Sequence, residues 1–250
     1  MMNKNILHDT EHRTAPMPTI PWVMYQKWED ILVLHVPVEI EELAPFIPDQ
    51  LTLDTYQGKA WISIFPFLIR DLRFRGLPKF PYVHHFLELN VRTYVTYNDI
   101  PGVYFFSLDA AKALPVLGAR TVTLPYFKAR MKRTRDNGGI IYSSQRQFGS
   151  QAYFKGKYKV TSESREVEEG TIEHWLFERY RLYQTIGGTV WHIAIHHLPW
   201  TLAEVSVISD NEAINSLLPG NIEGVPTIAH YSHRLETLFW PLQKSKKKHT

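Results

Sequence analysis

Three polar side chains that can do chemistry stand at alternate positions in the segment Phe86–Ala110, FLELNVRTYVTYNDIPGVYFFSLDA. They are the carboxylate of Glu88, the amide of Asn90 and the guanidinium of Arg92. Alternate residues of an extended strand share one face, so these three point the same way. If that face is turned into the fold, they line a polar pocket. If it faces water, it is an ordinary solvated strand face, and the pattern alone leaves both interpretations open.

The element that carries them is predicted to be a β-hairpin. The run Asn98–Gly102 (NDIPG) is rich in turn-forming residues and precedes a second apolar strand, which predicts a hairpin with a longer loop containing Pro and Gly. One pairing register sets Arg92 opposite Asp109 and predicts a structural ion pair. Glu88, flanked by two leucines, is then the carboxyl group expected to have a perturbed pKa, with an ordinary solvated glutamate as the alternative.

A lysine amine is the other group with reactive potential. Lys128 lies in LPYFKARMKR, where Arg130 and Lys132 share its strand face. A lysine that is desolvated or placed beside other cations can form a Schiff base with a ketone or aldehyde. The alternative is an exposed basic strand end, because lysine is rarely fully buried.

Other motifs predict neither a cofactor nor a metal. The sequence has no dinucleotide-binding or phosphate-binding glycine motif and no G-x-S-x-G elbow, and it lacks cysteine altogether. Among twelve histidines, His192 and His196 share a strand face, but their spacing fixes no third ligand. We therefore predict no metal site, and the two histidines line a pocket or face the surface.

The charge distribution does not predict a nucleic-acid partner. The net charge is +3, but four lysines lie together at the end of the chain, and without them 24 basic residues stand against 25 acidic ones. A nucleic-acid-binding protein usually carries its positive excess on the folded surface. No run approaches the ~18 apolar residues of a membrane-spanning helix, and no leader pattern is present. We expect a cytoplasmic protein without a membrane partner, and leave open whether it forms a homo-oligomer.

The pattern of elements predicts one mainly β domain. We divide the 250 residues into a mobile N-terminal arm (1–20), a single domain (21–242) and a basic tail (243–250). Many short strands occur at near-regular spacing, among them Ile31–Val38 and a pair turning at Gly187–Gly188, with short helices at Glu39–Pro48 and after Asp210. This arrangement is typical of an antiparallel barrel or sandwich with a few peripheral helices.

Several motifs resemble the YqjF-like family of bacterial domains of unknown function. They are WEDILVLHVPVEIEELAPFIPDQLTLDTYQGKAWISIFPF, FLELNVRTYV, PGVYFFSLDA, GAR, LPYF and WLFERYRLY, in the order of the family and within roughly Trp22 to Leu202. That family looks like a branch of the acetoacetate-decarboxylase-like superfamily. The resemblance therefore implies a single-domain closed cone-like barrel with a central cavity.

The same resemblance implies site residues, with one serious departure. The decarboxylases have a Schiff-base lysine just after a Gly-Tyr-Pro motif, a glutamate on an earlier strand and an arginine near the start of the domain. Pro125 and Glu88 match the proline and the glutamate, and His35 stands loosely in the place of the arginine. Tyr126 stands where the decarboxylases have lysine, and Lys128 follows two residues later on the same strand face. The resemblance thus implies the fold but not the decarboxylation.

These observations predict a small-molecule site inside the barrel. Its substrate-binding residues are expected to be His35, Asn90, Arg92, Asp109 and Tyr126, and its ligand a carbonyl or carboxylate compound that Arg92 holds through two hydrogen bonds. An enzyme of lyase type, with Lys128 and Glu88 as catalytic residues, is the first alternative. A non-catalytic protein-interaction domain is the second, suggested by the 13% aromatic content.

Overall fold

The structure is a computed structural model that describes residues 6–79, 81–82, 84–112 and 124–246. The described chain is mainly β, as predicted, with a few short helices. Its strands are β1 (Met24–Val38), β2 (Thr52–Leu53), β3 (Ala60–Phe74), β4 (Phe86–Tyr97), β5 (Ile100–Ala110), β6 (Tyr126–Asp136), β7 (Gly139–Arg146), β8 (Tyr153–Val160), β9 (Arg165–Glu166), β10 (Arg181–Ile186), β11 (Thr189–His196), β12 (Thr201–Ser209) and β13 (Ile228–Lys244). Its helices are α1 (Ile40–Leu43), the 3₁₀-helix η1 (Ala44–Phe46), α3 (Ile172–Phe177) and α4 (Asn211–Asn215).

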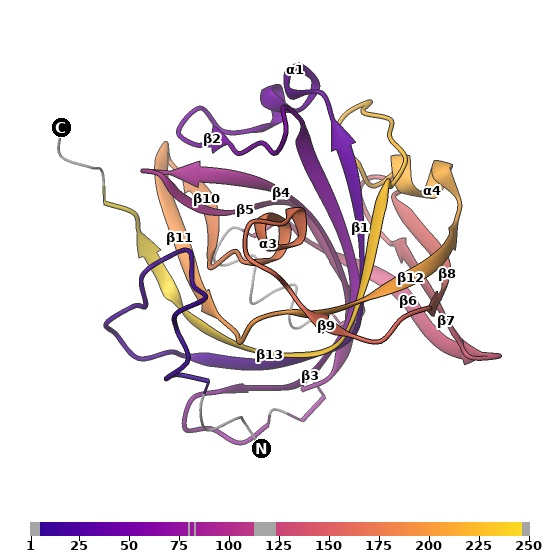
Figure 1. Cartoon of the computed structure of the whole chain (residues 1–250), viewed down its shortest axis with the longest axis horizontal. Helices are drawn as coiled ribbons and strands as arrows, with labels where there is room; N and C mark the ends of the chain where they lie inside the picture. Colours follow the sequence, from indigo (N-terminus) through magenta and orange to yellow (C-terminus); the bar gives the residue numbers. More distant parts are fainter. Residues whose placement is uncertain (1–5, 80, 83, 113–123, 247–250) are drawn as a thin grey trace.

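The strand pairings close two rings that share five strands (Figure 1). The first ring follows the order β4, β3, β1, β13, β11, β10 and β5, and the pairing of β5 with β4 closes it. The second follows β4, β3, β1, β13, β12, β8, β7, β6 and β5 and is closed by the same pairing. Strands β1, β3, β4, β5 and β13 therefore form a wall between the two rings. Helix α3 lies in the middle of the first ring (Figure 1).

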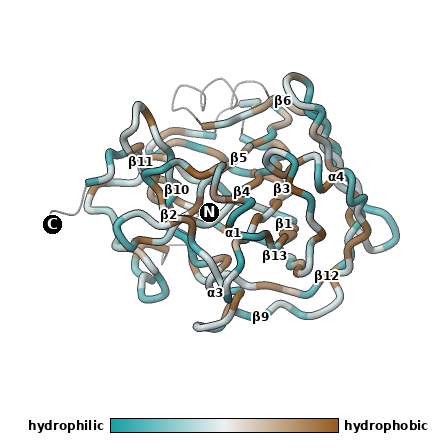
Figure 2. Tube along the Cα trace, turned by 90° about the horizontal axis from the view of Figure 1, so that it is seen from above, coloured by the Kyte–Doolittle hydropathy of each residue, from teal (hydrophilic) through white to brown (hydrophobic). Residues whose placement is uncertain are grey.

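The shared strands are buried on both faces. Residues of one face cluster with Leu176 and Phe177 of α3, and we call this face the α3 side. Residues of the other face cluster with Ile214 and Leu217, in and just after α4, and we call it the α4 side. The hydropathy colouring in Figure 2 accordingly shows hydrophobic residues gathered on β1, β3 and β5 in the interior. A polar residue on a shared strand consequently needs a protein partner, a water molecule or a ligand.

The predicted central hairpin is confirmed, but its turn is tighter than expected. Strands β4 and β5 stay paired up to Tyr97 and Ile100, so only Asn98 and Asp99 connect them, with φ angles of 53° and 62°. Two residues in the left-handed region form a type I′ turn, whose twist matches that of the strands. Asn and Asp tolerate this region better than most residues. The Pro-Gly pair that we placed in the loop belongs to β5.

Other local predictions also agree with the structure. Gly187 and Gly188 connect β10 to β11 with φ angles of 56° and 73°, and Asp210 caps α4 by accepting a hydrogen bond from the Glu212 N–H at 3.0 Å. The motif GAR, residues 118–120, lies outside the described residues. Within the described chain, no helix has the length and apolar character needed to cross a membrane.

Parts of both predicted terminal segments contact the rest of the chain. Ile6 is fully buried, and Arg13 donates hydrogen bonds to the Ile195 carbonyl at 3.0 Å and to His196 Nδ1 at 2.8 Å. At the other end, the Ser245 N–H donates to a carbonyl of β11 at 2.9 Å. These contacts are made with residues far away in the sequence, and the division into arm, domain and tail stays a prediction. Residues 1–5 and 247–250 lie outside the described chain.

A buried carboxylate ties the shared wall to the second ring. Asp30, only 3% exposed, sits at an irregularity of β1 with a φ of 49°. Its carboxylate accepts hydrogen bonds from Arg133 and Arg135 of β6, and from the Tyr231 hydroxyl of β13 at 2.7 Å. One acid thus satisfies donors from two further strands.

Replacing Asp30 by alanine is expected to lower the free energy of unfolding by about 3–5 kcal/mol, because it leaves the largely buried guanidinium group of Arg133 without its anion. Urea denaturation measures the loss. The matched control is Asp136→Ala, which breaks a half-exposed ion pair with Lys157 and should cost at most about 1 kcal/mol. Equal losses in the two variants would contradict the role assigned to Asp30.

Candidate functional site

The side chains of Glu88, Asn90 and Arg92 face the interior of the first ring. Phe86 and Tyr94, which alternate with them along β4, belong to the apolar cluster that contains α3, so all five residues lie on the α3 side. Glu88, Asn90 and Arg92 are 4%, 5% and 5% exposed. The solvated-face interpretation of this strand is therefore wrong.

Cross-strand pairing brings most of the predicted site residues into three adjacent rows. From one row to the next the strands advance two residues, or roughly 7 Å. The rows consist of His35, Ser63 and Arg92, then Asn90, Leu108 and Tyr126, then Glu88, Ala110 and Lys128. We call these rows together the inner patch. The register thus assembles, from β1, β3, β4, β5 and β6, residues that the sequence analysis selected one by one.

Arg92 is a buried cation with no carboxylate partner among the described residues. Its Nη2 donates to the Leu176 carbonyl of α3 at 3.4 Å, its guanidinium carbon lies 3.9 Å from the ring centroid of Phe65, and its Nε has no hydrogen-bond partner. Burial lowers the pKa of Arg92, and the positive charge of Arg179 adds to this effect. Arg179 is itself bound by the Asp54 carboxylate at 2.5 Å. Guanidinium groups stay protonated in proteins, so Arg92 brings an unneutralised positive charge into the barrel.

Asn90 also offers an unused hydrogen-bonding atom. Its Oδ1 is buried and has no partner in the described structure. Since most buried polar groups in native proteins are hydrogen-bonded, water or a ligand must complete this part of the patch.

Glu88 has the perturbed pKa expected from its apolar neighbours. Burial raises the pKa of Glu88 to about 8, a hydrogen bond from Tyr126 acts in the opposite direction, and the negative charge of Asp109 adds to the increase. The Tyr126 hydroxyl donates to Glu88 Oε2 at 2.9 Å. At neutral pH the carboxyl group is therefore mostly protonated and can itself donate a hydrogen bond.

Asp109 does not belong to the inner patch, and its predicted pairing with Arg92 is wrong. It lies opposite Leu89 on the α4 side, where Arg146 binds its Oδ1 through Nη2 at 2.8 Å and Nε at 3.0 Å. Arg92 lies opposite Phe105. At Asp109 the observed register differs from the predicted one by three residues, and each one-residue slip turns a strand's side chains to the other face. Asp109 is a structural ion-pair residue of the other ring.

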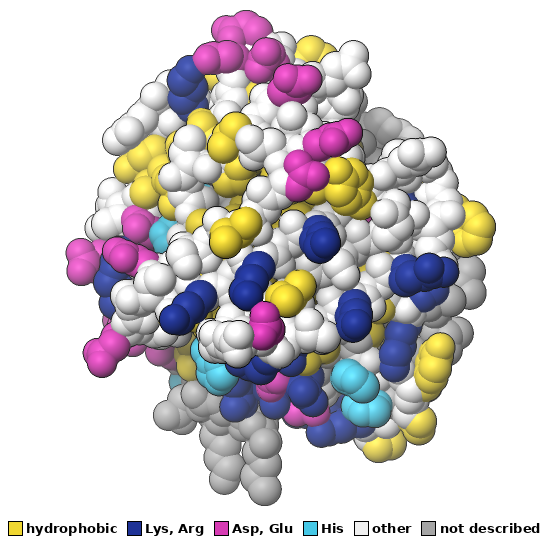
Figure 3. Space-filling view, turned by 90° about the vertical axis from the view of Figure 1, so that its right-hand side faces the viewer, with side chains coloured by type: hydrophobic (Ala, Val, Ile, Leu, Met, Phe, Trp, Pro, Cys, Tyr) yellow, Lys and Arg dark blue, Asp and Glu magenta, His cyan; other side chains and the backbone are white. Residues whose placement is uncertain are grey.

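Lys128 reaches the edge of the inner patch. It is half-buried, shares a row with Glu88 through Ala110, and its Nζ donates to the Ala111 carbonyl. The cations that were expected to perturb it, Arg130 and Lys132, are exposed. Figure 3 shows lysine and arginine side chains spread over this face of the molecule. The alternative interpretation, an exposed basic strand end, is therefore correct for Arg130 and Lys132.

His35 belongs to a chain of hydrogen bonds that leads towards Arg92. Its Nδ1 lies 2.7 Å from Ser63 Oγ, which lies 2.5 Å from the Tyr94 hydroxyl. Its Nε2 lies 3.3 Å from Nδ1 of His230, whose Nε2 is 3.5 Å from Oε1 of Glu173. The chain thus links the start of α3 to the residue beside Arg92.

The protonation of the end groups orients this chain. Burial lowers the pKa of both His35 and His230. The pKa of Glu173 is lowered despite its partial burial, because its own backbone N–H, the charge of Arg165 and the hydrogen bond from His230 favour the ionised form. An ionised Glu173 must accept, so each neutral imidazole donates from Nε2 and accepts at Nδ1. The Ser63 and Tyr94 hydroxyl groups then donate along the same direction.

Sequence reasoning missed the partners of His35. Ser63 and Tyr94 lie on other strands, His230 is far along the chain, and Glu173 belongs to the helix inside the ring. No local spacing links them. The only signal available was His35 itself, the one ionisable residue in an apolar run.

The two histidines considered as metal ligands are used separately. His192 Nδ1 lies 2.8 Å from Ser245 Oγ, while His196 contacts Arg13 and the Ile6 carbonyl of the N-terminal segment. Among the described residues, no group of three or more histidine, cysteine, aspartate or glutamate side chains has a metal-binding arrangement.

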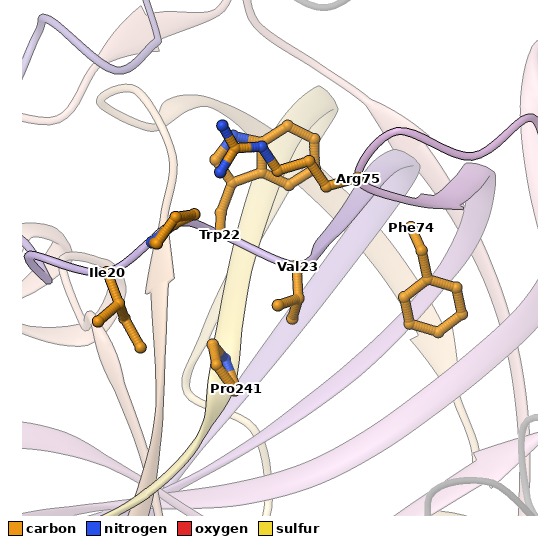
Figure 4. Close-up of a pocket in the computed structure, with 7 residues that line it drawn as sticks. Ile20, Trp22, Val23, Phe74, Arg75 and Pro241 are labelled. Carbon is orange, nitrogen blue, oxygen red and sulfur yellow. The ribbon is translucent and has the colours of Figure 1, made fainter.

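A separate open pocket lies at the surface, away from the inner patch (Figure 4). Trp22 and Val23 from the start of β1 meet Phe74 and Arg75 from the end of β3, and the Arg75 guanidinium lies 5.6 Å from the Trp22 ring. The walls are mainly apolar. They carry no acid or nucleophile, so this pocket has no evident chemistry.

Comparison with known proteins identifies the family. The model of DUF2071, a family of uncharacterized conserved proteins, matches residues 25–236. The chain is 44% identical over 239 residues to the uncharacterized protein YqjF of Bacillus subtilis (strain 168), a match that covers 94% of this chain and 97% of YqjF. The chain belongs to the DUF2071 family. The resemblance inferred from the motifs is thereby confirmed.

Solved structures confirm the acetoacetate-decarboxylase-like fold of this DUF2071 protein. An acetoacetate decarboxylase-like enzyme from Sphingomonas wittichii RW1 superposes with a TM-score of 0.60 at 12% identity, covering 94% of this chain and 99% of that one. Acetoacetate decarboxylase from Legionella pneumophila gives 0.55 at 13% identity, covering 99% and 97%. The enduracididine biosynthesis enzyme MppR complexed with pyruvate gives 0.58 at 10% identity, covering 92% of each chain. At these identities the likeness concerns the fold alone.

The raised pKa of Glu88 predicts a pH-dependent stability of this DUF2071 protein. The folded protein keeps a proton that the unfolded chain releases above the ordinary pKa of 4.5, so the group stabilises the fold fully below that value, and the stabilisation is lost as the pH rises to about 8. Denaturation of Glu88→Gln between these pH values should show a smaller decrease in stability than the wild type does. The control Glu41→Gln, at an exposed position of α1, should follow the wild type. A wild-type-like slope in Glu88→Gln would refute the raised pKa.

Proposed function

We propose that this DUF2071 protein binds a small organic acid on the α3 side of the first ring, with Arg92 holding the carboxylate. The observation that supports it is the buried guanidinium of Arg92, which has a free Nε and no carboxylate partner among the described residues. Burying an unpaired charge costs several kcal/mol. A planar carboxylate matches the fork of N–H donors on a guanidinium.

The charges around Arg92 also favour an anion. Arg179 and Asp54 neutralise each other, and Glu88 is mostly uncharged at neutral pH because its pKa is about 8. This leaves the positive charges of Arg92 and, at the edge of the patch, of Lys128, which favour an anionic ligand. The structure of MppR with pyruvate, a compound with a carboxylate and a carbonyl group, supports the same class of ligand in a protein of similar fold.

Replacing Arg92 by methionine should lower the affinity for butyrate at least tenfold, because the carboxylate loses its charged partner. Isothermal titration calorimetry with butyrate checks this. The same variant should unfold at higher urea concentration than the wild type, since an apolar side chain removes the buried unpaired charge. This combination of weaker binding and higher stability distinguishes a binding residue from a structural one.

The control is Arg130→Met, which removes an equal charge from the exposed face of β6 and should change neither property. Unchanged butyrate affinity in Arg92→Met would refute the proposed function.

A second candidate function is a lyase that uses Lys128 as a Schiff-base amine. It is favoured by the row that places Lys128 beside Ala110 and Glu88, so that an amine and a protonated carboxyl group flank one position. Against it, Tyr126 occupies the place where the resemblance implies lysine, and the Lys128 amine is engaged with a backbone carbonyl.

Borohydride trapping separates the two functions. If Lys128 forms an imine, incubation with acetoacetate and borohydride should add the mass of the reduced adduct to the intact protein, and Lys128→Ala should abolish the addition. Lys112→Ala, which removes a neighbouring exposed amine, serves as the control. An addition that persists in Lys128→Ala, or no addition with any keto acid or aldehyde, would rule out this chemistry at Lys128.

A further inference from the structure

We infer that the acid held by Arg92 is a hydroxy acid, whose hydroxyl group donates a hydrogen bond to Asn90 Oδ1. This inference rests on the proposed function and narrows its ligand. It comes from the order of hydrogen-bonding groups along the α3 side of β4. Arg92 offers a cation, Asn90 an acceptor and Glu88 a donor.

A carboxylic acid without a further donor group leaves Oδ1 of Asn90, a hydrogen-bond acceptor, without a partner. Asn90 is 5% exposed and its Oδ1 has no partner in the described structure. A carbonyl oxygen of an amide can only accept hydrogen bonds. A ligand that extends from Arg92 along the strand therefore needs an O–H or N–H group where it passes Asn90, or a buried acceptor is left unsatisfied at a cost of about 1–3 kcal/mol.

The donor beyond Asn90 is the carboxyl group of Glu88. Its Oε2 accepts from the Tyr126 hydroxyl, so in the neutral form the proton resides on the other oxygen and can be donated to the ligand. The distant end of the ligand is therefore expected to carry an acceptor. Glu88 lies four residues from Arg92, roughly 13 Å along the strand, with Asn90 midway between them.

The surrounding charge selects among the groups that can donate to Asn90. The positive charge of Arg92 has no carboxylate to offset it, and Arg179 is close enough to lower the pKa of Arg92. An ammonium group beside these cations would be repelled. A neutral hydroxyl group donates without adding charge, which favours a hydroxy acid over an amino acid.

Four short acids test the inference at constant chain length. Butyrate has neither donor nor acceptor beyond its carboxylate, acetoacetate has an acceptor at the β-carbon, and β- and γ-hydroxybutyrate have a hydroxyl group at two distances from the carboxylate. Calorimetry on the wild-type protein should show one of the hydroxy acids binding about tenfold more tightly than butyrate, the equivalent of one buried hydrogen bond. Acetoacetate should gain nothing from Asn90.

The matched variant is Asn90→Leu, which keeps the size of the side chain and removes its acceptor. It should lose the preference for the hydroxy acid over butyrate. Circular dichroism and the urea midpoint confirm that the variant is folded. If Asn90→Leu does not fold, Asn90→Asp replaces it, and its added negative charge should weaken the binding of all four acids.

The outcomes separate this inference from the proposed function. Equal, Arg92-dependent binding of butyrate and both hydroxy acids would overturn the inference and leave the proposed function standing. Tighter binding of acetoacetate than of either hydroxy acid would also overturn it, because it would show that Asn90 presents its NH₂ group to the ligand. Absence of binding by all four acids would overturn both.

Discussion

The burial of both faces of β4 is the constraint on which the rest of the structure depends. Five strands are shared between two closed rings, and β4 is one of them. Its α3 side faces the apolar cluster around Leu176 and Phe177, and its α4 side faces a second cluster. Water therefore has little access to either face. Every polar side chain on this strand must be satisfied by the protein or by something that enters the ring.

The two sides of the wall meet this constraint differently. On the α4 side, Asp109 of β5 forms an ion pair with Arg146, which binds it through two nitrogens. Asp30 of β1 likewise gathers two guanidinium groups and a hydroxyl group. On the α3 side, the partners of Arg92 among the described residues are a carbonyl at 3.4 Å, the Tyr94 side chain and aromatic rings, and none of them is a carboxylate. Completed ion pairs stabilise the fold, whereas an uncompleted one lowers stability and is typical of a site that binds a charged ligand.

The sequence predicted the hairpin and the common face of Glu88, Asn90 and Arg92, because strand periodicity is a local property. It could not predict that this face is buried, since alternation of polar and apolar residues usually marks a strand with one solvated side. The register of Asp109 was also out of reach, because a bulge near Val91 and Arg92 leaves no sequence signal. The partners in the chain of His35 come from four other elements, so only the closed ring reveals the chain they form.

Helix α3 contacts the inner patch at several points. Its Leu176 carbonyl accepts from Arg92, Glu173 ends the chain that begins at Tyr94, and Phe177 packs against His35 at 5.4 Å between ring centroids. A carboxylate that takes both nitrogens of the Arg92 fork competes with the Leu176 carbonyl for Nη2. It is the stronger acceptor, because a charge-assisted hydrogen bond is roughly twice as strong as a neutral one. The proposed function therefore couples ligand binding to the position of α3 in the first ring, because both use the guanidinium group of Arg92.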